Sequence, residues 1–222
     1  MSDAARADLT QTVRLTEIFF SLQGEAARSG LPSVFVRLTG CPLRCTWCDT
    51  EYAFTGGAPI PIADILARVA TFPTKRVCVT GGEPLAQKSC LPLLSAFCDA
   101  GYDVCLETSG ALDIRPVDPR VARIVDLKAP SSGESERNLL SNIPDLRDTD
   151  EIKIVLASRD DFEWAKKMIL THALTQRCDV VLSPVAGQLN PTDLAEWILA
   201  EGLPVRFQIQ LHKLLWSDAR GK

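Results

Sequence analysis

The feature that most constrains the fold is an alternation of short apolar strands with amphipathic helices along the 222 residues of the chain. Two strands are expected first, at 13–23 and 33–38. Helices at 61–72, 89–100, 159–172 and from Asn190-Pro191 to Gly202 then separate strands at 76–80, 103–107, 122–127, 152–156, 180–182 and 205–210. This order indicates a parallel sheet covered by helices. About eight strands are too few for a closed eightfold barrel, so the sequence predicts an α/β fold with a partial, open (β/α) barrel and a mostly parallel sheet.

The chain is expected to form a single domain over residues 1–222, because it shows no internal repeat and no linker between two cores. Its ends, 1–12 and 217–222, are polar or mixed in charge and are expected to be flexible. The most irregular stretch is 131–150, a polar segment typical of a mobile loop.

Charge and hydropathy argue against two classes of partner. The net charge is -4 and no run of five like charges occurs, so no large nucleic-acid footprint is expected. No apolar run approaches the ~20 residues that span a membrane, and Met1 to Gln11 lacks the apolar stretch of a signal peptide. We therefore expect a cytoplasmic protein with reduced thiols, in which the eight cysteines are not a disulfide framework.

Three cysteines lie close together with the spacing Cys41-x3-Cys45-x2-Cys48. Three thiolates on one loop can ligate three irons of a [4Fe-4S] cluster and leave the fourth iron open. An open iron can bind the amino and carboxylate groups of S-adenosylmethionine. An electron from the cluster can then break the sulfonium C–S bond and release a 5′-deoxyadenosyl radical. The spacing therefore predicts a cluster that cleaves S-adenosylmethionine.

Other interpretations of the cysteines remain open at this point. A zinc site would need a fourth ligand, and neither His172 nor His212 forms a second ligand pair. An electron-transfer module or three unrelated core thiols are the other possibilities. The remaining cysteines are expected to be structural, being Cys78 and Cys105 in strands and Cys90 and Cys98 at a helix, with Cys178 unassigned.

Unusual polar residues follow the carboxyl ends of several expected strands, where ligands bind in parallel α/β folds. They are Gln23-Gly24-Glu25, Gly40-Cys41, Gly81-Gly82-Glu83, Glu107-Thr108, Asp126 with Lys128, and Ser183. Lys153 lies in a strand and points either into the barrel or toward solvent.

These motifs resemble a known family. The three-cysteine motif, with Trp47 before its last cysteine, resembles the radical S-adenosylmethionine signature, and Gly81-Gly82-Glu83-Pro84 resembles the superfamily motif that contacts the methionine amino group. More narrowly, the chain from about Val13 to Trp216 resembles the 7-carboxy-7-deazaguanine synthases. The segments that carry this closer resemblance are Phe20 to Glu25, Val36-Arg37, Cys48-Asp49-Thr50, Glu107 to Gly110 and Gln210 to Lys213.

The resemblance implies a specific reaction and specific partners. The family converts 6-carboxy-5,6,7,8-tetrahydropterin into 7-carboxy-7-deazaguanine and ammonia, a step toward queuosine and other deazapurines, and regenerates S-adenosylmethionine. By resemblance the protein is a radical SAM lyase and a homodimer that needs Mg²⁺. It would receive electrons from a reducing partner such as flavodoxin or ferredoxin. A radical activase of a partner protein is the nearest alternative, but it would leave Gln23, Glu25, Arg37 and Thr50 unexplained.

The resemblance also assigns site residues. The pterin is expected to contact Leu22, Gln23, Gly24, Glu25 and Thr108, with Arg37 on its carboxylate and Thr50 on Mg²⁺. The cofactor is expected to contact Trp47, Cys48, Asp49, Gly81, Gly82, Glu83, Gly110, Asp126, Leu127, Lys128, Ser183, Pro184, Val185 and Ala186. The sequence departs from the family at Ala26, often a glycine, and at Asp126-Leu127-Lys128, commonly Ser-Pro-Lys.

Overall fold

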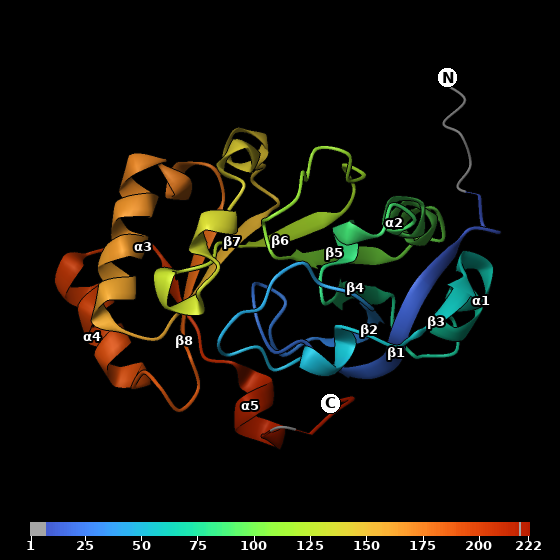
Figure 1. Ribbon diagram of the computed structural model, residues 1–222, viewed down its shortest axis with the longest axis horizontal. Coiled ribbons are helices and arrows are strands. Elements are labelled where there is room, and N and C mark those ends of the chain that lie inside the picture. The colour runs from blue at the N-terminus through green and yellow to red at the C-terminus, as the bar shows by residue number, and fades with distance from the viewer. Residues whose placement is uncertain (1–7, 218) are drawn as a thin grey trace.

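A computed structural model describes residues 8–217 and 219–222, and a nine-stranded sheet organises them (Figure 1). The strands are β1 (Thr12–Leu22), β2 (Pro32–Leu38), β3 (Ala58–Pro61), β4 (Arg76–Gly81), β5 (Asp103–Thr108), β6 (Ala122–Asp126), β7 (Glu151–Leu156), β8 (Asp179–Pro184) and β9 (Arg206–Phe207). The α-helices are α1 (Ile62–Val69), α2 (Cys90–Asp99), α3 (Arg159–Thr171), α4 (Pro191–Glu201) and α5 (Leu211–Trp216).

The strands follow the order β3-β1-β2-β4-β5-β6-β7-β8-β9. From β2 to β9 each neighbouring pair is parallel, whereas β1 pairs antiparallel with both β2 and β3. Within the described residues β3 and β9 end the sheet without pairing to each other, so the barrel is open. The predicted α/β architecture with a partial, mostly parallel barrel is therefore confirmed.

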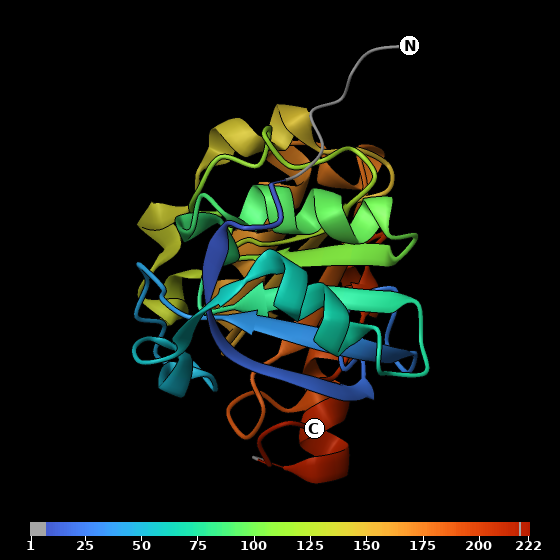
Figure 2. The same ribbon diagram turned by 90° about the vertical axis from the view of Figure 1, so that its right-hand side faces the viewer.

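Two apolar cores lie between the sheet and its helices. One packs α1 and α2 against β1, β2, β4 and β5, with Phe97 fully buried in it, and the other packs α3 and α4 against β6 to β8 around Phe162. Figures 1 and 2 show these helix pairs covering opposite ends of the sheet. On the inner side a small cluster of Ala26, Phe35, Cys78, Cys105 and Ile124 fills the barrel, and we call it the apolar plug. The apolar plug therefore closes the barrel interior on one side, so that a cavity inside the barrel has an apolar floor.

Local sequence explains where the helices begin and end. Ser158 caps α3 by accepting a hydrogen bond from the Asp161 amide at 3.2 Å. Asn190 caps α4 in the same way, Pro191 occupies its first turn, and Gly202 ends it with a φ of 59°. No helix among the described residues is both long enough and apolar enough to cross a bilayer.

Several elements differ from the sequence-based prediction. The helix expected from Pro61 begins at Ile62, because 58–61 pairs with β1 as an edge strand. The strand expected over 205–210 is only Arg206–Phe207, and α5 follows it. The irregular segment 131–150 contains short 3₁₀ turns. Of the ends expected to be flexible, 1–7 and 218 lie outside the described residues, and Thr12 already belongs to β1.

Candidate active site

The three motif cysteines lie on the loop that follows β2, at the carboxyl ends of the parallel strands. Cys41, Cys45 and Cys48 are free, half-buried thiols. All three line one cavity of about 260 Å³, whose walls come from strands β1, β2 and β4 to β7 and from the C-terminal segment. The cysteine loop therefore faces the polar strand ends that the sequence singled out.

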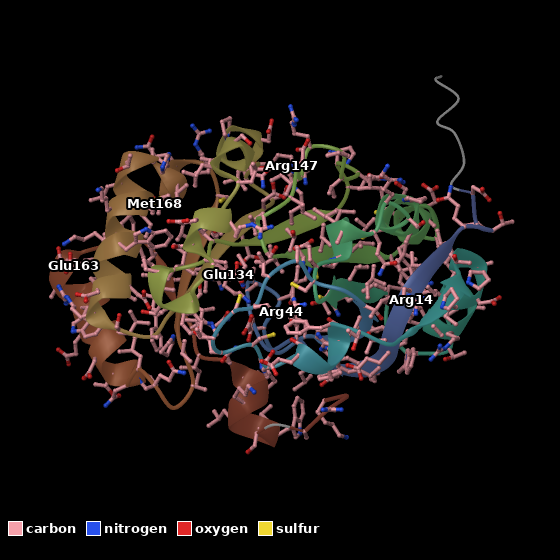
Figure 3. The ribbon with its side chains drawn as sticks, viewed as in Figure 1. Arg14, Arg44, Glu134, Arg147, Glu163 and Met168 are labelled. Atoms are coloured by element: carbon pink, nitrogen blue, oxygen red, sulfur yellow. The ribbon has the colours of Figure 1, made fainter. Side chains whose placement is uncertain are left out.

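Polar contacts fix the shape of this loop. The Arg44 guanidinium donates to the carbonyl oxygen of Cys41 at 2.9 Å, and the Arg44 amide donates to a Glu134 carboxylate oxygen. The Thr46 hydroxyl donates to the carbonyl oxygen of Ser131 at 2.9 Å. Figure 3 shows Arg44 and Glu134 close together beside the sulfur atoms. The turns that follow β6 thus hold the cysteine loop in place.

The cysteines fit an iron–sulfur cluster better than a single ion. No group of three or more His, Cys, Asp or Glu among the described residues is arranged to hold one metal ion. A [4Fe-4S] cluster presents a different iron to each thiolate, so its ligands need not converge on one point. Burial raises the pKa of the Cys41 and Cys45 thiols, and Lys128 partly opposes this rise. These are ligands that bound iron would hold as thiolates.

Two consecutive glycines bring the end of β4 against this loop. A Cβ at Gly82 would lie 2.3 Å from the carbonyl oxygen of Gly40 and 2.8 Å from the Cβ of Cys41. A Cβ at Gly81 would lie 2.5 Å from the carbonyl oxygen of Leu38. Any side chain would therefore force the strand end away from the cysteines, which explains why both positions are glycine.

Glu83 follows these glycines but does not line the cavity, because it is fully buried. Its carboxylate accepts hydrogen bonds from the Ser109 amide at 2.6 Å, the Leu85 amide at 2.9 Å and the Thr108 hydroxyl at 3.0 Å. The carboxylate thus fixes the end of β5 and aims Thr108, which does line the cavity.

Four charged side chains form a connected group on the cavity wall, which we call the open cluster: Glu25, Asp126, Lys128 and Lys153. Lys153 Nζ lies 2.5 Å from Glu25 Oε2 and 3.4 Å from Asp126 Oδ2, and Lys128 Nζ lies 2.8 Å from the same Asp126 oxygen. Burial disfavours the charged lysine, but Asp126 and Glu25 raise the pKa of Lys153 well above its ordinary value. Lys153 therefore points into the barrel as a cation.

Some polar atoms near the open cluster lack partners. Asp126 Oδ1 and the Ser183 hydroxyl are buried and form no hydrogen bond with any described residue. An unsatisfied buried polar atom is costly, so Asp126, which lines the cavity, is suited to a polar ligand that would satisfy its free oxygen, whereas Ser183 does not line the cavity. Both residues were predicted to contact S-adenosylmethionine, whose hydroxyl and amino groups offer such partners.

Arg37 extends from β2 into the cavity. Its Nε donates to Glu17 Oε1 at 2.8 Å, and its guanidinium lies over the rings of Phe19 and Tyr52. Burial raises the pKa of Tyr52 to about 12, because the hydrogen bond to Glu17 acts in the same direction and the opposing effect of Arg37 is smaller. The terminal guanidinium nitrogens of Arg37 form no hydrogen bond with a described residue. A planar two-donor edge therefore remains available for a carboxylate.

Hard oxygen donors lie at the cavity rim, just after the last motif cysteine. The Thr50 hydroxyl donates to Asp49 Oδ1 at 2.9 Å, and Asp49 Oδ2 lies 3.6 Å from His212 Nε2 and 3.7 Å from Lys213 Nζ. Burial would raise the pKa of Asp49, but hydrogen bonds from His212 and Thr50 lower it. A carboxylate and a hydroxyl side by side are ligands that suit Mg²⁺.

The C-terminal segment closes one side of the cavity. A Cβ at Gly24 would lie 2.3 Å from His212 Nδ1, so only glycine lets α5 approach the β1 end this closely. Gln210 donates to Glu25 Oε1 at 2.7 Å, and the Arg220 guanidinium lies 4.3 Å from the Tyr52 ring centre. Ser217 and residues 219–222 also line the cavity.

The structure brings most of the predicted site residues together. Those that line the cavity are Leu22, Gly24, Glu25, Arg37, Cys41, Cys45, Trp47, Cys48, Asp49, Thr50, Gly81, Gly82, Thr108, Asp126 and Lys128. The predicted contacts that do not line it are Gln23, Glu83, Gly110, Leu127, Ser183, Pro184, Val185 and Ala186. Sequence reasoning assigned no site role to Glu107, Gln210 or His212, although all three line the cavity.

Comparison with known proteins shows which family this chain resembles in sequence. Residues 35–129 match the model of the radical SAM superfamily. A 7-carboxy-7-deazaguanine synthase of Chlorobaculum tepidum is 48% identical over 94% of this chain and 97% of its own length. One from Koribacter versatilis is 39% identical over 92% of this chain and 97% of its own.

A solved structure has a similar fold. QueE from Escherichia coli superposes with a TM-score of 0.75 at 25% sequence identity. The match covers 90% of this chain and 95% of that one, so the two folds correspond over nearly their full lengths.

Proposed function

The chain belongs to the 7-carboxy-7-deazaguanine synthase family of the radical SAM superfamily, and on that premise we propose that it contracts 6-carboxy-5,6,7,8-tetrahydropterin to 7-carboxy-7-deazaguanine with loss of ammonia. It is a radical SAM enzyme of the lyase class. The single observation that carries the substrate assignment is that the three free cysteines share one cavity with the available guanidinium edge of Arg37.

In this proposal the chain holds its cofactors with residues at the strand ends. Cys41, Cys45 and Cys48 would ligate three irons of a [4Fe-4S] cluster. When bound, the cluster and S-adenosylmethionine supply an electron and a 5′-deoxyadenosyl radical that takes a hydrogen atom from the substrate. Asp126 Oδ1, a buried cavity-lining atom without a partner among the described residues, would bind a polar group of the cofactor.

Substrate orientation is the main task left to the protein. Arg37 would bind the pterin carboxylate through its two terminal nitrogens. Thr108, held by Glu83, would hydrogen-bond to the ring system, and the open cluster would fix Glu25 beside it. The apolar plug beneath the cavity excludes water from the floor of the site. Fixing a reactant in this way can lower a barrier by several kcal/mol.

The proposal includes Mg²⁺ at Thr50, with Asp49 beside it as a second oxygen donor. Mg²⁺ retains several waters and takes one or two protein ligands together with substrate oxygens, which suits a hydroxyl and a carboxylate at a cavity rim. A homodimer, a flavodoxin or ferredoxin as reductant, a cytoplasmic location and a role in queuosine synthesis are further predictions from family membership.

Anaerobic reconstitution tests the proposed reaction. We expect the protein, incubated with iron and sulfide, to bind about four irons. With S-adenosylmethionine, dithionite, Mg²⁺ and the carboxypterin it should yield a deazapurine identified by mass spectrometry. Cys45→Ala should lose both the cluster spectrum and the product. Cys98→Ala is the matched control and should keep both, because Cys98 lies on α2 and does not line the cavity.

Three outcomes would contradict the proposal in different ways. One bound zinc per chain would indicate a structural metal site. A cluster with four protein ligands would indicate an electron-transfer module. A cluster that cleaves S-adenosylmethionine but leaves the carboxypterin unchanged would favour an activase of a partner protein.

Thr50→Ala tests the magnesium site separately. Loss of the hydroxyl should weaken the Mg²⁺ dependence of product formation more than it slows cleavage of S-adenosylmethionine, because the cysteines are unchanged. Equal loss of both activities would contradict a metal-ligating role for Thr50. The control is Thr71→Ala, which removes an exposed hydroxyl just after α1 that does not line the cavity. Thr46→Ala would be unsuitable as a control, because the Thr46 hydroxyl anchors the cysteine loop.

A further inference from the structure

Glu107 lines the cavity at the end of β5, but neither family resemblance nor the proposed function gives it a role. We propose that Glu107 determines substrate specificity by accepting hydrogen bonds from the two adjacent N–H donors of a 2-amino-4-oxopyrimidine ring. This inference rests on the proposed function and deepens it, because it states which edge of the pterin the protein recognises.

Strand register places Glu107 at the level of Arg37. Arg37 on β2 is paired with Thr80 on β4, and the Thr80 hydroxyl donates to Glu107 Oε2 at 2.8 Å on the next strand. One layer below, the residues Phe35, Cys78 and Cys105 are paired across the same three strands and belong to the apolar plug. Arg37 and Glu107 therefore lie in the same layer directly above the closed floor of the barrel, on either side of Thr80.

Two internal donors fix the Glu107 carboxylate. Gln23 Nε2 donates to Oε1 at 2.9 Å, and the Thr80 hydroxyl donates to Oε2. A carboxylate oxygen has two acceptor sites, so each oxygen keeps one for a ligand. Among the described residues no cation forms an ion pair with Glu107, although Lys153 and Arg37 are near enough to attract it. The carboxylate is thus oriented but not saturated, and Gln23 and Thr80 act as positioning residues.

The chemistry of the pterin fits this arrangement. Its pyrimidine ring presents a ring N–H next to an exocyclic amino group, and a carboxylate matches such a pair of parallel donors. The substrate carboxylate lies at the opposite end of the two-ring system. Arg37 and Glu107 are two strand spacings apart, roughly 10 Å between backbones, which is comparable to the long axis of a two-ring heterocycle. One cation and one anion can therefore bind opposite ends of the same molecule.

Glu107→Gln tests this recognition, because an amide keeps one acceptor and replaces the other by a donor. We expect kcat/KM for the carboxypterin to fall about 100-fold, mainly through KM, since binding rather than chemistry is weakened. The second substrate is the analogue with a carbonyl oxygen in place of the 2-amino group. The wild type should discriminate against this analogue by a factor of about 1,000 or more. Glu107→Gln should narrow the preference to within about tenfold, because its amide can donate to that carbonyl.

Two further variants separate recognition from folding. Thr80→Val removes one positioning bond but keeps the carboxylate, so we expect a smaller loss, about fivefold, with the preference for the 2-amino substrate retained. Glu163→Gln makes the same chemical change on α3, away from the cavity (Figure 3), and should leave both substrates unaffected. Iron content should equal the wild type in all three, and in Glu163→Gln substrate-free cleavage of S-adenosylmethionine should also equal the wild type.

Three results would overturn the inference. A Glu107→Gln variant that keeps the wild-type preference shows that Glu107 does not contact the aminopyrimidine edge. An equal loss with both substrates, or a loss of iron, assigns it a structural role. A wild-type protein that cleaves S-adenosylmethionine but converts no carboxypterin refutes the proposed function itself, and this inference with it.

Discussion

Two groups of buried charge lie three residues apart on β6, on opposite faces of the sheet. Arg123 belongs to the outer group with Arg147 and Asp150, which we call the closed cluster. Asp126 belongs to the open cluster on the inner face. Both groups consist of ion pairs that are largely removed from solvent, yet they differ in how completely their polar atoms are bonded.

In the closed cluster the charged groups are bonded to one another and to backbone. Asp150 is fully buried and accepts hydrogen bonds from Arg123 and from the guanidinium and amide of Arg147. The remaining guanidinium nitrogens donate to carbonyl oxygens of the neighbouring loops, such as Ile114 at 3.1 Å and Asp145 at 2.6 Å. A satisfied network of this kind fixes two loops to the sheet and has no capacity left for a ligand.

The open cluster has unused bonding capacity. Asp126 Oδ1 has no partner among the described residues, and all four members line a cavity. Burial of charge alone therefore does not identify a functional site. The informative observation is a buried, oriented polar atom without a partner, adjacent to space that a ligand can enter.

The largest expected effect is a loss of protein stability when the closed cluster is disrupted. Asp150→Ala would leave the buried Arg123 guanidinium without its counter-ion, so we expect the free energy of unfolding to fall by about 3–5 kcal/mol. Chemical denaturation at neutral pH measures this change. Asp148→Ala, two residues away and exposed, is the control and should unfold like the wild type. A small effect of Asp150→Ala would mean that the closed cluster is no more essential than surface charge.

Lys153→Met should produce the opposite pattern. It removes the central cation of the open cluster, which leaves Glu25 without its cation and Asp126 with Lys128 as its one remaining cation. We expect turnover to fall about 100-fold through misplacement of these groups. Stability should fall less than in Asp150→Ala, because the cavity lets water reach the carboxylates. Lys167→Met on the exposed face of α3 is the matched control for both measurements. If Lys153→Met kept full activity and lost much of its stability, the open cluster would be structural like the closed cluster, and the proposed difference between them would be wrong.

The sequence could predict the inner face of the barrel only in part. Strand and helix periodicity indicated the sheet, and the spacing of Cys41, Cys45 and Cys48 indicated the cluster loop, because both signals are local. Lys153 could not be placed, since a lysine in a strand reaches either solvent or a barrel interior. Its direction depends on pairing with Glu25, which is distant in sequence. The same limit applies to Glu107, whose partners are Thr80 on β4 and Gln23, the residue that follows β1.

The C-terminal site residues were missed for a related reason. Helix α5 has only six residues, and its approach to the cavity depends on Gly24 having no side chain. The motif Gln210 to Lys213 was a signal for this, but a contact between the two ends of the chain is not visible in either segment alone. The closed cluster was also missed, because Arg123 and Asp150 carry no motif.

Acidification provides a smaller test of the closed cluster. Burial would raise the pKa of Asp150, but hydrogen bonds from Arg123 and Arg147 outweigh it and lower the pKa. An unfolded aspartate has a pKa of about 3.9, so below about pH 4 the unfolded chain binds a proton that the folded chain does not. The free energy of unfolding should therefore fall as the pH drops through this window. Asp150→Asn should show a shallower fall in denaturation midpoints, and an unchanged slope would contradict the role assigned to Asp150.

The smallest effect is expected at a third, exposed group of charges that tests whether burial is needed at all. On α3, Glu163 pairs with Arg159 at 2.5 Å and with Lys166 at 3.1 Å, and Lys166 also reaches Glu201 on α4. These side chains are well solvated, so water replaces any lost partner and salt screens the attraction. Glu163→Gln should therefore shift the melting temperature by no more than about 1 °C, and less at high salt. A shift as large as that of Asp150→Ala would mean that the number of ion pairs, rather than their burial and satisfaction, sets the stability of this fold.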